Sequence, residues 1–163
     1  MCNSVNSPES KIHLLKDFER PFNDCVVTNG CFDIIHAGHV RYLYEASKLA
    51  TLFIVGLNSD ASVRQLKGPA RPIQSQDERA LVLAAFGFVD QVVIFDEPRA
   101  TEFLCAASPS VYVKGGDYTL ESLDPGERNV LQLAGVPIKF IPMVEGKSTS
   151  DLIERIYALH PRT

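Results

Sequence analysis

Residues 24–39 read DCVVTNGCFDIIHAGH and decide the fold. The apolar, β-branched run stops at Gly30, and its length favours a strand over residues 24–29. Beyond the turn, residues recur at helical spacing and predict a helix of about three turns. These are Val40, Leu43, Tyr44, Ser47 and Ala50. The stretch is therefore a strand, a turn rich in glycine and histidine, and a helix.

The same alternation of strand and helix continues along the chain. Further apolar runs predict strands over residues 51–57, 91–95, 110–113 and 138–141. Helices are expected after Asn58-Ser59-Asp60, after Ser75, over residues 99–107, up to Ala134-Gly135, and from Ser148 to about Leu159. Strands that are apolar throughout and separated by helices are buried on both faces. The sequence therefore predicts an α/β fold with a doubly wound, parallel, five-stranded, Rossmann-like sheet.

The helix after residue 75 has the clearest start signal. SQDE over residues 75–78 is a capping box, and the preceding LKGPARPI is a loop because its glycine and prolines prevent regular structure. Helical spacing predicts that this helix buries Leu81, Ala84, Ala85 and Phe88.

Composition is that of a soluble protein with one domain. The chain has 163 residues, of which 45% are hydrophobic and 22% charged. We expect residues 1–22 to be an N-terminal extension and residues 23–163 to form the domain, since the first residues are polar. No apolar stretch predicts a signal peptide or approaches the ~20 residues of a membrane span, so a cytoplasmic location is expected. The four cysteines form no C-x-x-C pair and are expected to be reduced thiols.

The net charge and the expected topology together indicate that any anionic ligand is bound by local groups of residues. A net charge of −4 and a pI near 5.5 give no global reason to expect nucleic acid or an anionic membrane as partner. Ligands of doubly wound folds bind beyond the carboxyl ends of the strands. Three loops rich in glycine, histidine, lysine and hydroxyls follow such ends, over residues 30–39, 114–117 and 145–149. We therefore expect one site on a shared rim.

The HAGH turn has the features of a phosphate site. His36 and His39 fall on one face of a first helical turn, and Gly38 lets a phosphate approach the backbone. Free N–H groups and the helix dipole favour an anion there. Two alternatives exist: capping or surface histidines, and a zinc site that adds Cys31 and Asp33. Structural zinc sites usually take paired ligands from two separate elements, which this single cluster lacks.

The absence of two known nucleotide-binding motifs narrows the range of reactions that the chain could catalyse. The chain has no P-loop and no G-x-G-x-x-G turn, which argues against a P-loop kinase and a dinucleotide dehydrogenase. Cys31 in a tight turn is more typical of packing than of a nucleophile. A site that holds phosphates without forming a covalent bond suits attack by an acceptor phosphate on an α-phosphorus. Lys114, after an apolar strand and before two glycines, is harder to explain as surface charge than Lys67, Arg71 or Arg79.

Four segments resemble a known family. TNGCFDIIHAGHVRYL, VGLNSDASVRQLKGPARPI, YVKGGDY and VEGKSTSDLI occur in order within residues 27–153. They resemble the HxGH nucleotidylyltransferase superfamily, and within it the adenylyltransferase half of the bifunctional heptose kinase/heptose-1-phosphate adenylyltransferases of lipopolysaccharide synthesis. HxGH alone specifies the superfamily, whereas LKGPARPI together with VKGGDY is more specific.

The resemblance implies roles for particular residues. His36 and His39 would contact the triphosphate and stabilise the transition state, and Lys114 would share in catalysis. The nucleotide would be bound by Cys31, Phe32, Gly38, Arg79, Glu145, Lys147, Ser148, Thr149 and Ser150. Lys67 and Asp117 would face the acceptor. Mg²⁺ would bridge the triphosphate oxygens, and the partners would be small-molecule substrates. Separately from the resemblance, a homo-oligomer is expected because exposed sheet edges are commonly covered by symmetric partners.

Other functions stay open at this point. Met143 stands where the glycerol-3-phosphate cytidylyltransferase branch carries an arginine, which argues against that branch. A kinase half would not fit in the chain, so a separate protein is expected to supply heptose 1-phosphate. The alternatives are a cytidylyl- or guanylyltransferase acting on another sugar or polyol phosphate, and a nucleotide sensor that does not turn over.

Overall fold

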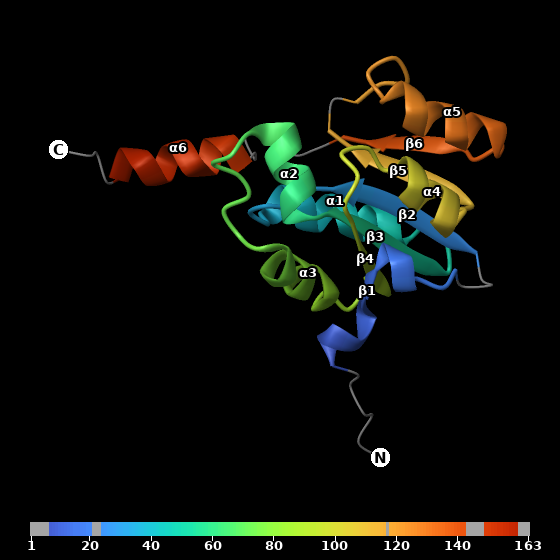
Figure 1. The fold of residues 1–163 in the computed structure, drawn as a ribbon, viewed down its shortest axis with the longest axis horizontal. Helices are drawn as coiled ribbons and strands as arrows, with labels where there is room; N and C mark the ends of the chain where they lie inside the picture. The colour runs from blue at the N-terminus through green and yellow to red at the C-terminus, as the bar shows by residue number, and fades with distance from the viewer. Residues whose placement is uncertain (1–6, 21–23, 117, 143–148, 160–163) are drawn as a thin grey trace.

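The computed structural model describes residues 7–20, 24–116, 118–142 and 149–159 (Figure 1). Six strands are formed: β1 (Ile12–Leu14), β2 (Cys25–Gly30), β3 (Leu52–Asn58), β4 (Gln91–Phe95), β5 (Val111–Gly115) and β6 (Ile138–Ile141). The helices are α1 (Ala37–Ser47), α2 (Asp60–Lys67), α3 (Gln76–Ala84), α4 (Thr101–Ala107), α5 (Pro125–Leu133) and α6 (Thr149–Leu159). Two 3₁₀ turns, Pro8–Lys11 and Leu15–Asp17, flank β1. The expected alternation of strand and helix is therefore confirmed.

All strand pairs of the sheet are parallel, in the order β1-β4-β3-β2-β5-β6. The chain moves outward from β2 through β3 and β4 on one side, and through β5 and β6 on the other. The order thus reverses between β2 and β5, where a doubly wound sheet opens a crevice at its carboxyl edge.

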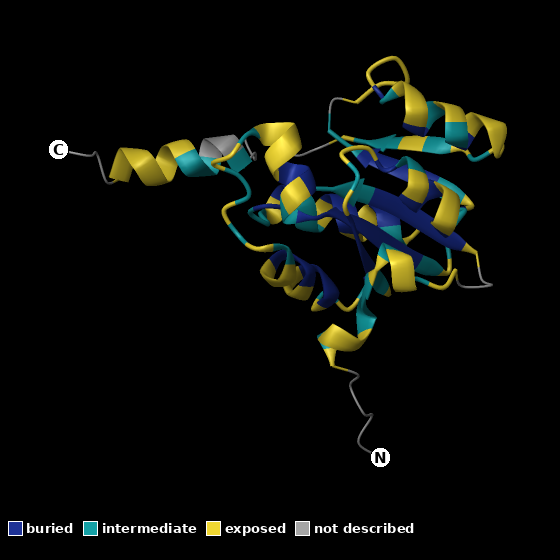
Figure 2. Ribbon diagram, viewed as in Figure 1, coloured by how far each residue is buried: buried dark blue, intermediate teal, exposed yellow. Residues whose placement is uncertain are grey.

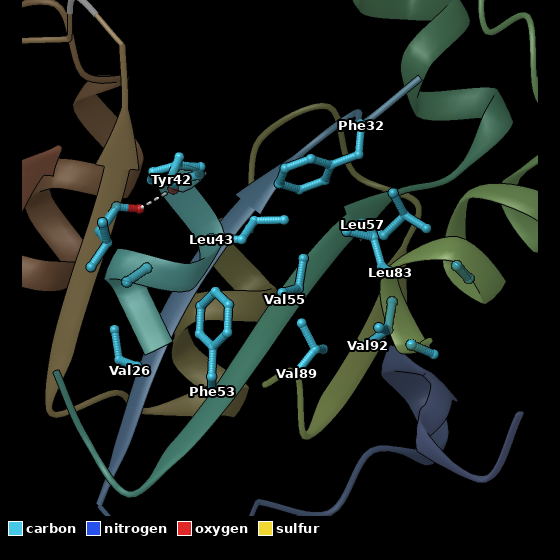
Figure 3. Packing of buried hydrophobic residues seen from close by; sticks show 14 of the residues in the cluster. Val26, Phe32, Tyr42, Leu43, Phe53, Val55, Leu57, Leu83, Val89 and Val92 are labelled. Carbon is cyan, nitrogen blue, oxygen red and sulfur yellow. Dashed lines mark hydrogen bonds between the residues drawn. The ribbon is translucent and has the colours of Figure 1, made fainter. Parts of the chain in front are cut away.

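Helices cover both faces of the sheet, which explains why its strands are apolar throughout. On one face α1 and α3 pack against Phe53, Val55 and Leu57 of β3. On the other, α4 and α5 pack against Cys25, Val27 and Ile54. Figure 2 shows the resulting buried centre within an exposed shell, and Figure 3 shows Tyr42 and Leu43 of α1 lying over the strands.

The sheet has six strands, and the expectation of five was wrong. The additional strand, β1, lies within residues 1–22 and pairs in parallel with β4 in the register Ile12–Val92 to Leu14–Ile94. Three residues are too few to show strand periodicity, and the sequence around them is polar, so the pattern gave no signal. The domain boundary at residue 23 stays a prediction, but the preceding segment contributes to the sheet.

Of the buried stripe expected for α3, only Ala84 is confirmed. The capping box at Ser75 is present, but the helix buries Arg79, Ala80, Leu83 and Ala84. Leu81 is 41% exposed, Ala85 is exposed and Phe88 is half-buried. The spacing of apolar residues does not reveal this face, because the face includes the charged side chain of Arg79.

Candidate active site

A cavity of about 380 Å³ opens at the carboxyl edge between β2 and β5. Its lining includes six residues expected at the site: Cys31, Phe32, His39, Lys67, Lys114 and Thr149. They come from four separate parts of the chain, which the parallel topology brings to one edge. The expectation that the turn after β2 and the loop after β5 share a rim is confirmed for these residues.

His36 and His39 lie together at the start of α1. His36 is the N-cap, and its Nδ1 accepts a hydrogen bond from the backbone N–H of Gly38 at 3.1 Å. The two imidazole rings stand 3.9 Å apart between centroids. The capping role that the sequence offered as an alternative is therefore real for His36, and it fixes the first turn that carries His39.

His39 is held as a neutral imidazole. Burial, the neighbouring His36 and Lys67 lower its pKa to about 4. Its ring and that of Phe32 form a T-shaped pair with centroids 5.5 Å apart. Its Nδ1 is buried without a hydrogen-bond partner in the part of the chain that the structure describes. A neutral ring can still donate one N–H to a phosphate oxygen.

Arg79 supports the turn from beneath. It is fully buried, and its guanidinium donates to the carbonyls of Cys31 at 2.6 Å and Asn58 at 2.9 Å. It also bonds the carbonyl of Gln74 and pairs with Asp60 at 2.7 Å. Arg79 does not line the cavity with the other residues expected to bind nucleotide. Its hydrogen bonds instead hold together the turn that lines the cavity.

Asp33 ties the same turn to the proline-rich loop. Its Oδ1 accepts from the backbone N–H groups of Ile73 and Gln74 at 2.7 and 3.1 Å. Its Oδ2 lies 2.6 Å from Nε of Arg71. Cys31, Asp33, His36 and His39 do not form a group of three or more metal-binding side chains, and the described residues contain no other such group. The geometry therefore gives Asp33 an orienting role.

Lys114 stands at the floor of the cavity in a buried polar cluster. Its Nζ donates to Asn29 Oδ1 and to Tyr112 Oη, both at 2.9 Å, and lies 3.5 Å from Glu127 Oε2. Burial lowers the pKa of Lys114, an effect that Glu127 opposes. Sequence reasoning missed Asn29, Tyr112 and Glu127. A polar residue ending an apolar strand could have pointed to Asn29, but Glu127 reads as an ordinary acidic residue in a first helical turn.

A known protein family matches the part of the chain that carries the site. The family model described as cytidylyltransferase-like matches residues 27–155, from β2 to α6. The chain belongs to this cytidylyltransferase-like family. It is a nucleotidyltransferase, as the HxGH turn led us to expect.

Its curated relatives in this family include longer proteins named bifunctional protein HldE. The one from Syntrophotalea carbinolica is 45% identical over 154 residues, which cover 94% of this chain and 31% of the relative. The one from Wolinella succinogenes is 51% identical over 152 residues, covering 93% and 31%. The one from Campylobacter concisus is 53% identical over 131 residues, covering 80% and 26%. The chain thus spans less than a third of the length of these relatives.

Solved structures support the fold. The lipopolysaccharide core biosynthesis protein from Thermoplasma volcanium superposes with a TM-score of 0.60 at 24% identity, covering 77% of this chain and 99% of that one. Pantoate-beta-alanine ligase from Francisella tularensis gives 0.54 at 11% identity, covering 86% of this chain and 72% of that one.

The remaining expected residues of the nucleotidyltransferase site divide into two groups. Gly38 is buried in the first turn of α1, and Lys67, at the end of α2, is exposed at the cavity mouth. Asp117, Glu145, Lys147 and Ser148, and the side chain of Ser150, lie outside the described residues.

No helix among the described residues is long and apolar enough to cross a membrane.

The chemistry of the lining suits transfer without a covalent intermediate. Burial raises the pKa of the Cys31 thiol above its usual value, although Lys67 and Arg79 oppose the shift. A thiol in that state is a poor nucleophile at neutral pH. What the cavity offers is one neutral imidazole, one buried ammonium and a helix N-terminus, all suited to holding phosphate oxygens.

Proposed function

We propose that the chain transfers the adenylyl group of ATP to a sugar 1-phosphate, heptose 1-phosphate, to give ADP-heptose and pyrophosphate. One observation carries the proposal: His39, in the first turn of the helix that follows β2, and Lys114, near the end of β5, line one cavity. The similarity to proteins named bifunctional protein HldE supports the choice of acceptor. The proposed partners are small-molecule substrates.

The proposed step needs no catalytic base. An oxygen of the acceptor phosphate, already ionised at neutral pH, attacks the α-phosphorus of ATP. A new P–O bond forms, the bond between the α-phosphorus and the bridging oxygen to the β-phosphate breaks, and pyrophosphate leaves with the electron pair. ATP enters as its Mg²⁺ complex, whose charge the metal partly neutralises. The protein's part is to position the reactants and stabilise developing charge.

Four residues of the site have a part in this proposed step. His36 caps α1 and so fixes the turn on which His39 sits. His39 donates a hydrogen bond to an oxygen of the reacting phosphates. Lys114 supplies a positive charge at the floor, where burial makes that charge act strongly on a phosphate. Lys67 at the mouth attracts the incoming anions.

A pyrophosphate-release assay tests the proposal. Purified chain is given Mg²⁺ with ATP, CTP or GTP, and with heptose 1-phosphate or glycerol 3-phosphate. We expect turnover with ATP and heptose 1-phosphate. His39→Ala is the control for contaminating activity and should lower kcat by at least ~10², with a smaller change in KM for ATP.

Other outcomes would assign a different function. Turnover with CTP and glycerol 3-phosphate would replace the heptose assignment by a cytidylyltransferase acting on a polyol phosphate. Nucleotide binding without turnover for every acceptor would favour a sensor.

A further inference from the structure

The Lys114 ammonium has three hydrogens, and among the residues that the structure describes it has three acceptors at unequal distances. Asn29 Oδ1 and Tyr112 Oη each accept at 2.9 Å, whereas Glu127 Oε2 stands at 3.5 Å. Two donors are therefore engaged in short bonds, and the third meets a carboxylate at the edge of hydrogen-bond range. That third hydrogen is the one that can be exchanged for a phosphate oxygen without disturbing the other two bonds.

Glu127 is fixed independently of Lys114. It lies in the first turn of α5 with 4% of its surface exposed, and its Oε1 accepts the backbone N–H of Ala100 at 3.0 Å. The N-cap Asp124 accepts from the backbone N–H groups of Gly126 and Glu127, which holds the start of the helix. The carboxylate is therefore anchored on one oxygen and presents the other to the cluster.

Tyr112 also lies near the second oxygen of Glu127, but its hydroxyl hydrogen is directed elsewhere. A tyrosine hydroxyl has one hydrogen, and that of Tyr112 makes its shorter bond to Asn29 Oδ1 at 2.5 Å, against 3.3 Å to Glu127. Because that hydrogen is directed to Asn29, Glu127 Oε2 is left to act as the counter-ion of the Lys114 ammonium at 3.5 Å.

We propose that Glu127 is a positioning residue for nucleotidyl transfer, whose buried carboxylate keeps the Lys114 ammonium charged at the cavity floor between catalytic cycles. This role rests on the proposed function, since it acts through Lys114. A substrate phosphate takes the place of Glu127 as the third acceptor of the ammonium, while Asn29 and Tyr112 keep their bonds. Glu127 itself does not need to touch substrate.

The electrostatics of the cluster explain why a counter-ion is needed. Burial lowers the pKa of Lys114, and Glu127 is the largest influence opposing that loss, followed by Cys31. Arg99 lowers the pKa further, and the Tyr118 ring faces Nζ at 5.5 Å from its centroid. Without the carboxylate, a buried lysine beside an arginine would release its proton at a lower pH.

The test is the variant Glu127→Gln, which keeps the size of the side chain and its acceptor for Ala100 but removes the charge. The kcat/KM of the reaction reports ionisations of the free enzyme. We expect the high-pH limb of that profile to move to lower pH by about one unit or more, which lowers kcat/KM about tenfold on the limb. Glu127→Asp, which keeps the charge, should restore the position of the limb even where kcat is reduced. Glu102→Gln, on the exposed surface of α4, should leave the profile unchanged.

A second measurement does not depend on turnover. NMR of the lysine side chain gives the pKa of Lys114 directly, in the wild type and in Glu127→Gln. A lower pKa in the variant supports the inference, and an unchanged pKa overturns it. A uniform loss of rate at all pH values, with the limb unmoved, would also overturn it and assign Glu127 to structure. If the wild type turns over no acceptor, the proposed function fails, whereas the lysine titration still decides the pairing.

Discussion

In the first turn of α1, His36 is held by a local hydrogen bond, whereas the pKa of His39 is set partly by a residue further along the chain. The HAGH pattern was sufficient to place His36 and His39 at the start of a helix, because capping and anion binding both depend on local spacing. The low pKa of His39 depends on burial and on charges that include Lys67, at the end of α2. The burial of Arg79 likewise depends on acceptors up to 48 residues away. No local pattern contains those partners.

The ionisation of His39 is a prediction at this scale. In the free protein we expect a pKa of about 4, because burial and two positively charged or ionisable neighbours disfavour the imidazolium. Side-chain NMR across the acid range measures it. The folded-state pKa lies below the usual 6.5, so the native state binds fewer protons in between. The stability that this neutral ring contributes is therefore full above pH 6.5 and is lost as the pH falls towards 4.

Binding of nucleotide should act on the same equilibrium in the opposite direction. The negative charge of MgATP favours the imidazolium, so the pKa of His39 should rise on saturation with MgATP. His13 on β1, away from the cavity, is the internal reference, and its resonances should stay in place. A pKa near 6.5 in the free protein would contradict the buried, neutral imidazole.

At the scale of elements, contact between α1 and β5 joins the two halves of the site. Tyr42 of α1 lies against Gly115. Its hydroxyl donates to the carbonyl of Val113 at 3.2 Å, the bond dashed in Figure 3, and also pairs with Thr28. The helix that carries His39 is thereby held to the strand that carries Lys114. Apolar runs were sufficient to predict β5 and its neighbour β2, since both strands are buried on both faces of the sheet. The close approach of Tyr42 was not predictable, because a glycine after a strand reads first as a turn.

Gly115→Ala tests this contact. A Cβ at that position would lie 2.8 Å from Cδ2 of the buried Tyr42 ring, and the ring cannot move away without breaking its hydrogen bonds. Overpacking of this kind should lower the free energy of unfolding by about 1–3 kcal/mol, measured by urea denaturation. Gly87→Ala is the matched control, because its Cβ would meet nothing within 4 Å. Equal effects of the two substitutions would show that the contact does not matter.

For the whole molecule, the edge of the sheet is the part that sequence analysis described least well. The central strands and the reversal of their order follow from hydrophobic pattern and connection rules, and they locate the cavity. The edge strand β1 has only three residues, and tertiary contacts hold it. Lys11, just before β1, donates from Nζ to the carbonyls of Phe86 at 3.3 Å and Val89 at 2.8 Å. These bonds fasten the N-terminal segment to the turn that leads into β4.

The variant Lys11→Met removes this attachment but leaves the backbone pairing of β1 with β4 in place. The substitution keeps the aliphatic stem but removes a charged donor from two carbonyls, which should lower the free energy of unfolding by about 1–2 kcal/mol. Amide exchange should rise in β1, because a short edge strand that loses its anchor opens more often than the central strands. Lys16→Met, an exposed lysine in the same segment, is the control and should change stability by no more than about 0.5 kcal/mol. Unchanged protection of β1 in Lys11→Met would mean that strand pairing with β4 alone holds the sixth strand, and the lysine would then contribute only to the turn.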